Sequence, residues 1–163
     1  MIFEETKITG VFIVKPELVR DDRGFFARTW CAKEFADHGL NPVVVQCSTS
    51  FNWAEGTVRG MHYQDIPFEE DKLVRCTRGA IYDVALNLKT GQWIGTVLTD
   101  MNAWALYIPK GFAHGYRTLV DDTEVFYQMS EYYHPEAAKE ISPSVIPWPA
   151  NLRDALDRRE SCL

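Results

Sequence analysis

The chain has 163 residues, a formal net charge of −6 and 13% aromatic residues. A chain of this length is expected to fold as one domain, with a core large enough to need neither disulfides nor metal for stability. The acidic balance lacks the basic face that DNA- and RNA-binding proteins present, so we expect no nucleic-acid partner. The sequence has neither a signal-peptide pattern nor an apolar run of membrane-spanning length. We therefore predict one cytoplasmic domain over residues 1–163, without membrane association and with a charged tail from about residue 150.

The first predicted elements are strands. Ile8 to Val14 is predicted as a strand that bends at Gly10. Residues 21–24 read Asp-Asp-Arg-Gly, which is a turn signal, and the apolar pair Phe25 and Phe26 then begins another strand.

One short helix is predicted over Thr29 to His38, because apolar and charged side chains fall on opposite sides of it, and Gly39 ends it. Val43 to Ser50 is rich in β-branched residues and is predicted as a strand. From there to about residue 130, short apolar runs recur at intervals of about 8–12 residues. The turn residues between these runs are Gly56, Gly60, Gly79, Gly91, Gly95, Pro109, Gly111 and Gly115. This spacing predicts an all-β sandwich or barrel rather than alternating β-α-β units.

Two similar segments, Gly56–Gln64 and Pro109–Gly115, each combine a turn glycine, a strand-like stretch and a histidine. Strand alternation places His62 and Gln64 on one face, and neutral imidazole is well suited to remove a proton near neutral pH. His62 is therefore a candidate general base, and a hydrogen-bonded structural histidine is the alternative. His114 lies between two small residues, which let a ligand or another backbone approach.

A metal site is a second hypothesis for these histidines. A metal-binding β-barrel usually pairs His-x-His with a following glutamate, whereas this chain reads His62-Tyr63-Gln64. Asp65 and Glu69 are near in sequence, but the resulting ligand set is poor, so we predict no metal. The four cysteines are Cys31, Cys47, Cys76 and Cys162. They include no Cys-x-x-Cys pair, which argues against a zinc knuckle, and although an even count permits two disulfides, free thiols are expected in the cytoplasm.

Other charged and aromatic residues are candidates for a site only when they are considered together, because each alone is as readily explained by a structural role. A buried Lys72 would stabilise a developing enolate, although an isolated lysine is usually a surface residue. Rigid guanidinium groups suited to phosphate oxygens are available at Arg23, Arg59 and Arg75. A tyrosine acts as an acid or simply fills a core. If the strand stays regular, alternation predicts Tyr127 and Tyr133 on one side, with Tyr132 on the other.

Taken together, these segments resemble the dTDP-4-dehydrorhamnose 3,5-epimerases, which are nucleotide-sugar epimerases of the cupin (jelly-roll) fold. The resemblance runs from about Ile8 to Pro149. It rests on Asp22–Phe26, Gly56–Gln64, Lys72–Arg75, Gly79–Val84, Ile108–Gly115, Tyr127 with Tyr132–Pro135, and Ile146–Pro149, in matching order and spacing. It implies an all-β, double-stranded β-helix barrel with a few short peripheral helices, a homodimer, no metal and no cofactor. It also implies an isomerase that inverts C3, C5 or both in a nucleotide-diphospho-4-keto-6-deoxy sugar through an enolate.

The resemblance implies roles for individual residues. His62 matches the base that removes a proton next to the C4 ketone, Lys72 the cation that stabilises the enolate oxygen, and Tyr127 the acid that returns a proton on the opposite face. Arg59 and Arg23 match contacts to the diphosphate, with Arg23 reaching the site of the partner subunit. The other positions that match the substrate pocket are Phe26, Gln46, His114 and Tyr133. In this family an aspartate near the C-terminus holds the base histidine, and Asp157, with Asp154 as the alternative, is its match.

Departures from the family pattern leave the substrate open. Where the family often has Glu after the Phe-Phe pair and Asn after the strand glutamine, this chain has Arg28 and Ser48. The loops over residues 88–93 and 141–144 are also short. These changes fall where the nucleotide base and the sugar are read, so a base other than thymine, a different 4-keto sugar such as a heptose, and inversion of a single centre stay open. A ketoisomerase on the same fold and a non-catalytic protein that binds sugar nucleotides are the alternative functions.

Overall fold

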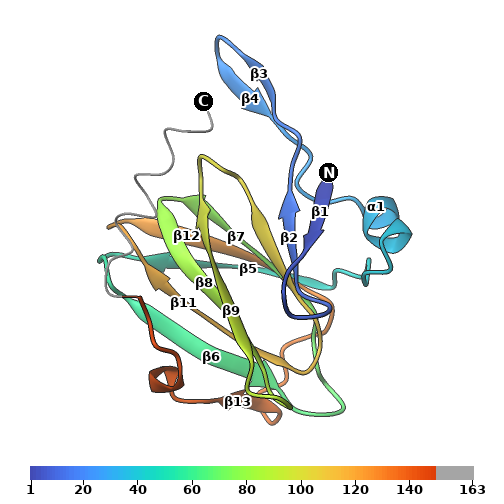
Figure 1. Cartoon of the computed structure of the whole chain (residues 1–163), viewed down its shortest axis with the longest axis vertical. Coiled ribbons are helices and arrows are strands. Elements are labelled where there is room, and N and C mark those ends of the chain that lie inside the picture. The colour runs from blue at the N-terminus through green and yellow to red at the C-terminus, as the bar shows by residue number, and fades with distance from the viewer. Residues whose placement is uncertain (150–163) are drawn as a thin grey trace.

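The computed structural model describes residues 1–149 and consists mainly of β-strands arranged in two sheets (Figure 1). The six-stranded sheet has the order β1 (Ile2–Glu5), β2 (Phe12–Lys15), β10 (Ala105–Ile108), β7 (Lys72–Arg78), β12 (Thr123–Met129) and β5 (Gln46–Asn52). The five-stranded sheet has the order β13 (Ala138–Glu140), β6 (Val58–Gln64), β11 (Phe112–Thr118), β8 (Ala80–Asn87) and β9 (Trp93–Thr99). Neighbouring strands in both sheets are antiparallel. The predicted all-β jelly-roll class is confirmed.

A hairpin, a helix and a 3-10 turn lie outside the two sheets. The hairpin consists of β3 (Val19–Asp21) and β4 (Gly24–Phe26) and projects from the body of the molecule, at the top of Figure 1. The helix α1 (Ala32–Asp37) packs its one buried side chain, Phe35, on the six-stranded sheet. The 3-10 turn η1 (Pro143–Val145) follows β13.

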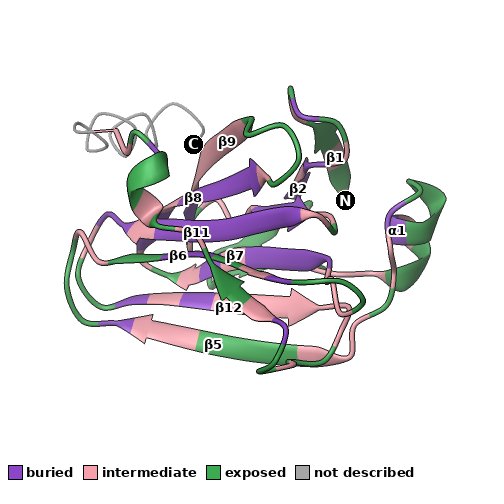
Figure 2. Cartoon of the chain, turned by 90° about the horizontal axis from the view of Figure 1, so that it is seen from below, coloured by how far each residue is buried: buried purple, intermediate pink, exposed green. Residues whose placement is uncertain are grey.

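The main core lies between the sheets, where residues such as Val74 of β7 and Ile81 of β8 belong to one apolar cluster. A second cluster, which includes Phe35, covers the outer face of the six-stranded sheet. A third cluster, which includes Met61 and Ile146, covers the outer face of the five-stranded sheet. Figure 2 shows the buried residues concentrated in β7, β8 and β11, in the middle of the molecule. Side chains on these central strands are therefore held by packing on both faces.

The N-terminal strands differ from expectation in two respects. The strand expected from Ile8 begins at Phe12, because residues 8–11 form the turn between β1 and β2, in which the Val11 amide donates to the Ile8 carbonyl oxygen. The strand β1 was not predicted, since its residues Ile-Phe-Glu-Glu are mostly exposed and show no apolar alternation.

The next two elements were predicted with shifted boundaries. The helix covers Ala32–Asp37 rather than Thr29–His38, because Cys31 still has an extended backbone with φ of −151°. The strand expected over Val43–Ser50 runs over Gln46–Asn52, because its partner β12 ends at Met129, opposite Gln46.

The described residues also bear on the expected state of the cysteines and on membrane-spanning helices. Cys31, Cys47 and Cys76 are free thiols, whereas Cys162 lies outside the described residues. Between residues 1 and 149, no helix has the length and apolar character needed to cross a membrane.

Candidate active site

Three side chains form a row across the five-stranded sheet. His62 on β6 lies opposite Glu140 on β13 and opposite His114 on β11 in the strand register. Residues directly opposite one another across an antiparallel pair point to the same face of the sheet. The Nε2 atom of His62 lies 3.8 Å from Oε2 of Glu140, and the His62 side chain is 56% exposed. The predicted base therefore stands beside a second histidine and a carboxylate while staying open to solvent.

His114 is buried against a carboxylate that the sequence pattern did not single out. Its Nε2 atom lies 2.7 Å from Oδ1 of Asp83 on β8, and Asp83 is fully buried. Such a carboxylate fixes the tautomer and orientation of the imidazole. The second oxygen of Asp83, Oδ2, has no hydrogen-bond partner among residues 1–149. The sequence does hold a signal for Asp83, which is an acid within the otherwise apolar run Ala80–Ala85. An acid in such a buried strand needs a partner.

Lys72 connects the two sheets at this site. It begins β7 of the six-stranded sheet, it is 8% exposed, and its Nζ donates to the His62 backbone carbonyl oxygen, 3.2 Å away. The same Nζ lies 3.0 Å from Oε1 of Glu70, so the buried charge is paired. An ammonium group has three donors, which leaves one for a substrate oxygen. The alternative reading of Lys72 as a surface lysine is wrong.

Tyr127 approaches this row from the other sheet. It lies on β12, and its ring centroid is 5.9 Å from that of His114 at an interplanar angle of 78°. Burial raises the pKa of Tyr127 well above its usual value of 10, and the nearby Tyr116 and Asp83 raise it further. The phenol therefore stays protonated at neutral pH. His62 and Tyr127 thus come from facing sheets, and both are neighbours of His114.

The electrostatic surroundings of His62 favour its neutral form. Partial burial lowers the pKa of His62 below its usual value of 6.5, because even this half-exposed ring loses some of the water that would stabilise the imidazolium. Glu140 opposes this shift by attracting the positive form, whereas the charges of Lys72, His114 and Arg59 lower the pKa further. The imidazole is therefore able to accept a proton at neutral pH.

Three other predicted site residues lie on or near these strands. Arg59 opposes Tyr116 in the β6–β11 pair, in the same sheet as His62. Gln46 and Tyr133 contact each other, because the Tyr133 amide donates to Oε1 of Gln46 at 2.6 Å. The strand does not run on to Tyr133, since β12 ends at residue 129, so the alternation expected of a regular strand does not relate Tyr127 to Tyr133.

The remaining predicted residues are not brought to His62 within one chain. Arg23 is on the projecting hairpin, where it pairs with Asp21 and has a side chain that is 90% exposed, and Phe26 of the same hairpin is 75% exposed. Arg75 follows the inward-facing Val74 and places its guanidinium over the ring of Phe126, 5.3 Å from the centroid. The candidates Asp154 and Asp157 lie outside the described residues, so their pairing with His62 stays a prediction.

The metal hypothesis gains no support from the described side chains. Among residues 1–149, no three histidine, cysteine, aspartate or glutamate residues are grouped so that they could hold a metal ion. The carboxylate beside His114 instead pairs with one ring nitrogen, which makes Asp83 an orienting partner of the imidazole.

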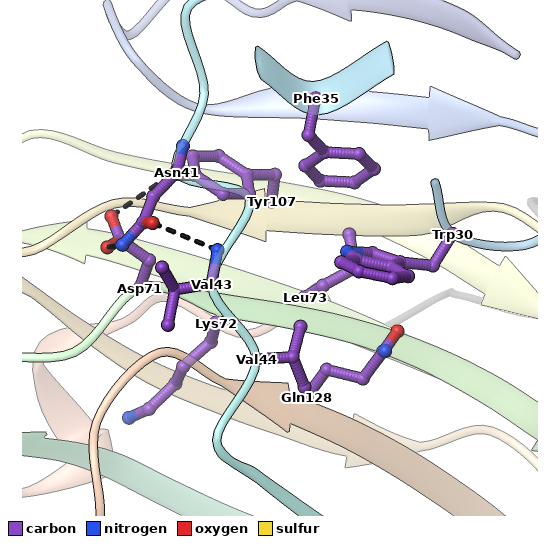
Figure 3. Close-up of a pocket in the computed structure, with 10 residues that line it drawn as sticks. All are labelled: Trp30, Phe35, Asn41, Val43, Val44, Asp71, Lys72, Leu73, Tyr107 and Gln128. Carbon is purple, nitrogen blue, oxygen red and sulfur yellow. Dashed lines mark hydrogen bonds between the residues drawn. The ribbon is translucent and has the colours of Figure 1, made fainter. Parts of the chain in front are cut away.

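Asp71, the neighbour of Lys72, anchors the start of β7 and lines a small pocket beneath α1 (Figure 3). Its carboxylate accepts hydrogen bonds from Nδ2 of Asn41 at 2.8 Å, and from the hydroxyl groups of Tyr107 and Ser130 at 3.0 Å each. In Figure 3 the Lys72 side chain points away from the Tyr107 ring. The hydrogen bonds of Asp71 therefore hold the start of β7 in place, while the Lys72 ammonium contacts the His62 carbonyl oxygen and Glu70 between the sheets.

Gly115→Ala is expected to destabilise the protein next to this site. A methyl group at Gly115 would lie 2.7 Å from the Arg59 carbonyl oxygen and 2.6 Å from Sδ of Met61. Because a backbone atom of a paired strand cannot easily move aside, we expect the free energy of unfolding to fall by about 1–3 kcal/mol. For a chain of this size, that corresponds to a Tm lowered by about 2–12 °C. Thermal unfolding followed by circular dichroism measures the change, and an unchanged Tm would show that β6 and β11 are not so close.

Comparison with known proteins places this chain in a family. The sequence profile described as dTDP-4-dehydrorhamnose 3,5-epimerase matches residues 5–158. The chain belongs to the dTDP-4-dehydrorhamnose 3,5-epimerase family. The predicted family and the predicted class of enzyme, an isomerase, are thereby confirmed.

Members of this family resemble the chain over most of its length. The dTDP-4-dehydrorhamnose 3,5-epimerase of Sinorhizobium fredii is 37% identical over an alignment of 174 residues, gaps included. The alignment covers 99% of this chain and 87% of the relative. The structure of the Bacillus anthracis enzyme, with TDP and PPi bound, is 37% identical, covers 91% of this chain and 90% of its own, and superposes with a TM-score of 0.86. The Legionella pneumophila dTDP-6-deoxy-D-glucose-3,5-epimerase, in complex with dTDP-4-keto-L-rhamnose, is 33% identical with a TM-score of 0.84, and the match covers 91% and 83% of the two chains.

Proposed function

We propose that this member of the family inverts C3, C5 or both in a nucleotide-diphospho-4-keto-6-deoxy sugar, with His62 as the base and Tyr127 as the acid. The observation that carries the proposal is the position of His62 and Tyr127 on facing sheets, both beside His114. A base and an acid on opposite sides of a carbon remove a proton from one face and return one to the other. The neutral imidazole and the protonated phenol are the forms that these roles require.

The reaction starts at the hydrogen on a carbon next to the C4 ketone. The His62 imidazole accepts this proton, and the electron pair of the C–H bond moves toward the ketone oxygen to form an enolate. The Lys72 ammonium donates a hydrogen bond to that oxygen and stabilises its negative charge. Tyr127 donates its proton to the opposite face of the same carbon while the C=O bond re-forms. His62 then loses its proton to solvent and Tyr127 regains one, so the carbon carries a hydrogen derived from solvent.

The rest of the substrate is assigned from chemistry and from the relatives. Arg59 is exposed on β6, and a guanidinium group binds phosphate oxygens in a bidentate manner, which suits a diphosphate. The complex of the Legionella relative with dTDP-4-keto-L-rhamnose supports dTDP as the nucleotide. Asp157, or Asp154, is the proposed partner that orients His62, and Glu140 is a carboxylate near its ring in the described part of the chain.

The rate of the reaction is expected to fall at acidic pH with a midpoint below 6.5. His62 acts as a neutral base and its pKa is lowered from 6.5, so activity is lost only as the pH falls through that lower value. Tyr127 acts as a phenol and its pKa is raised from 10, so it causes no loss at mildly alkaline pH. A profile of kcat/KM from about pH 5 to about pH 9 measures both the loss at acidic pH and the constant rate at mildly alkaline pH. An acidic midpoint above 6.5 would argue against His62 as the base.

We also propose a homodimer in which Arg23 of one subunit completes the site of the other. The projecting hairpin exposes Val19, Phe25 and Phe26, and apolar side chains gathered on a projecting element are typical of an interaction surface. Co-expressed Arg23→Ala and His62→Ala subunits, each strongly impaired alone, are expected to recover about one quarter of wild-type activity, because half of the dimers are hybrids with one intact site. The co-expressed subunits are purified in equal amounts, and the activity of the mixture is compared with that of the same amount of wild-type protein. Its absence, with dimers present, would remove Arg23 from the partner's site.

The proposed reaction is tested with dTDP-4-keto-6-deoxyglucose in deuterated water, followed by NMR, with the GDP and CDP analogues in parallel. Deuterium and inversion at both C3 and C5 would establish a double epimerase, and change at one carbon would establish a single epimerase. Movement of the ketone from C4 to C3 would identify a ketoisomerase instead. No change with any nucleotide would contradict catalysis and favour a binding protein.

A further inference from the structure

Gln64 is a buried amide at the end of β6, two residues after His62, and none of the reaction steps above uses it. It is 5% exposed. A side-chain amide is removed from water at a cost in free energy unless its oxygen and nitrogen are hydrogen-bonded. The partners of Gln64 therefore indicate which part of the chain it holds in place.

Both ends of the Gln64 amide bind backbone groups of two loops. Its Nε2 atom donates to the carbonyl oxygens of Phe68, at 2.9 Å, and of Tyr132, at 3.0 Å. Its Oε1 atom accepts from the His134 amide at 2.6 Å. Phe68 lies in the loop between β6 and β7, whereas Tyr132 and His134 lie in the loop between β12 and β13. One side chain therefore ties these two loops together.

A ring contact joins the same two loops. The rings of Phe68 and His134 are stacked, with centroids 3.7 Å apart and an interplanar angle of 15°. Nδ1 of His134 also lies 3.1 Å from Oε1 of Glu136, in the same loop. The two loops therefore pack as one unit, with the Gln64 amide between their backbones.

This unit lies beside Lys72 at the proposed site. Gln46, Met129 and Lys72 lie directly opposite one another across β5, β12 and β7, so their side chains point to the same face of the six-stranded sheet. The Lys72 ammonium places that face between the sheets, because it contacts the backbone of β6. The Tyr133 amide donates to Oε1 of Gln46 at 2.6 Å. The backbone of Tyr133 is therefore anchored at the edge of the site.

The Tyr133 ring, in contrast, is open to solvent. Tyr133 is 61% exposed, although Gln46 binds its own amide and Gln64 binds the amide of the next residue. An exposed ring on a fixed backbone is suited to binding, because little conformational freedom is lost when a ligand stacks on it. A nucleotide sugar offers two rings for such a contact, the planar base and the sugar.

We propose that Gln64 is a positioning residue that fixes Tyr133 at the edge of the site as a stacking face for one ring of the nucleotide sugar, an inference that rests on the proposed substrate. The amide holds the backbone on both sides of Tyr133, at the Tyr132 carbonyl and the His134 amide. Without these bonds the ring takes several positions, and ordering it on binding lowers the affinity. Gln64 thereby acts on substrate affinity through Tyr133.

Four variants separate positioning from a purely structural role. Gln64→Met keeps the volume of the side chain and removes its three hydrogen bonds. Tyr133→Ala removes the ring, and a double variant combines the two changes. Asn102→Leu is the matched control, because the Asn102 side chain also bonds three backbone groups, but in the turn between β9 and β10.

Calorimetry gives the affinity of each variant for dTDP-glucose, which carries both rings, and for TDP, which carries only the base. Gln64→Met and Tyr133→Ala are each expected to weaken dTDP-glucose binding at least about fivefold, the lower end of what one stacking contact contributes. The double variant is expected to bind no more than about twofold more weakly than Tyr133→Ala, because the amide acts through the ring. Asn102→Leu is expected to keep the wild-type affinity.

The TDP titrations assign the stacked ring. A parallel loss of TDP affinity in Gln64→Met and Tyr133→Ala places the base on Tyr133. A loss confined to dTDP-glucose places the sugar there.

A purely structural role lowers the number of folded binding sites and leaves their affinity unchanged. Wild-type affinity for dTDP-glucose in Gln64→Met or in Tyr133→Ala overturns the inference, and so do additive losses in the double variant. If Gln64→Met does not fold, Gln64→Asn decides instead, because its amide is one methylene short of the two loops.

The inference and the proposed function fail in different ways. A wild-type protein that does not bind dTDP-glucose overturns the inference. A wild-type protein that binds dTDP-glucose but neither exchanges nor inverts the 4-keto sugar contradicts the proposed reaction, and the affinities of Gln64→Met and Tyr133→Ala still decide the role of Gln64.

Discussion

Replacing His62 with alanine is expected to abolish detectable deuterium exchange at C3 and C5 and to lower kcat/KM by about a thousandfold. His62 takes the proton whose removal creates the enolate, so no later step occurs without it. The fold is expected to tolerate the change, because the side chain is 56% exposed and its Nε2 atom is 3.8 Å from the nearby carboxylate of Glu140. A loss of about 0.5 kcal/mol or less in the free energy of unfolding is typical of such surface substitutions. NMR of the exchange reaction and thermal unfolding of the same sample measure the two quantities.

His38→Ala provides the matched control for this experiment. His38 is an exposed histidine at the end of α1, where its Nδ1 lies 2.8 Å from the Glu34 carbonyl oxygen, and it lies outside the proposed site. Its removal is expected to leave exchange unchanged. Normal exchange in His62→Ala would mean that another group removes the proton, and His114 with its partner Asp83 would be the next candidate.

Tyr127→Phe is expected to separate the two halves of the reaction. His62 still removes the proton and returns a solvent-derived one to the same face, so exchange continues, whereas inversion falls by about a hundredfold or more because the donor on the opposite face is missing. The ring keeps its place against His114, and the loss of the partly buried hydroxyl is expected to lower the free energy of unfolding by about 1 kcal/mol. NMR that records deuterium content and configuration at each carbon measures both rates.

Tyr107→Phe is the control for the removal of a buried tyrosine hydroxyl. The Tyr107 hydroxyl donates to Asp71 in the pocket under α1, away from the facing residues His62 and Tyr127. This variant is expected to lose stability but to keep the wild-type ratio of exchange to inversion. If Tyr127→Phe instead lowers exchange and inversion in parallel, Tyr127 does not act as a separate acid.

The all-β class of this chain was predictable from local pattern, because turn residues recur at the spacing of short strands. The strand boundaries were less predictable, since pairing partners decide them. β1 shows no alternation of its own and exists because it pairs with β2 along Ile2–Glu5. β5 ends at Asn52 rather than Ser50 because β12 offers partners up to that residue.

The amino-acid sequence by itself indicated His62, Lys72 and Tyr127 as candidate site residues, because each lies in a segment whose resemblance to the family can be seen without knowledge of its spatial neighbours. It did not identify Asp83, which matters through His114, 31 residues away. It also did not predict that the Asn52 amide is buried and hydrogen-bonded to Tyr116, 64 residues away. Such pairs have no local signal, because a strand ladder and two facing sheets bring together residues that are far apart in sequence. The tertiary structure alone decided which polar groups are buried together, because only the pairing and facing of the strands bring Asp83 against His114.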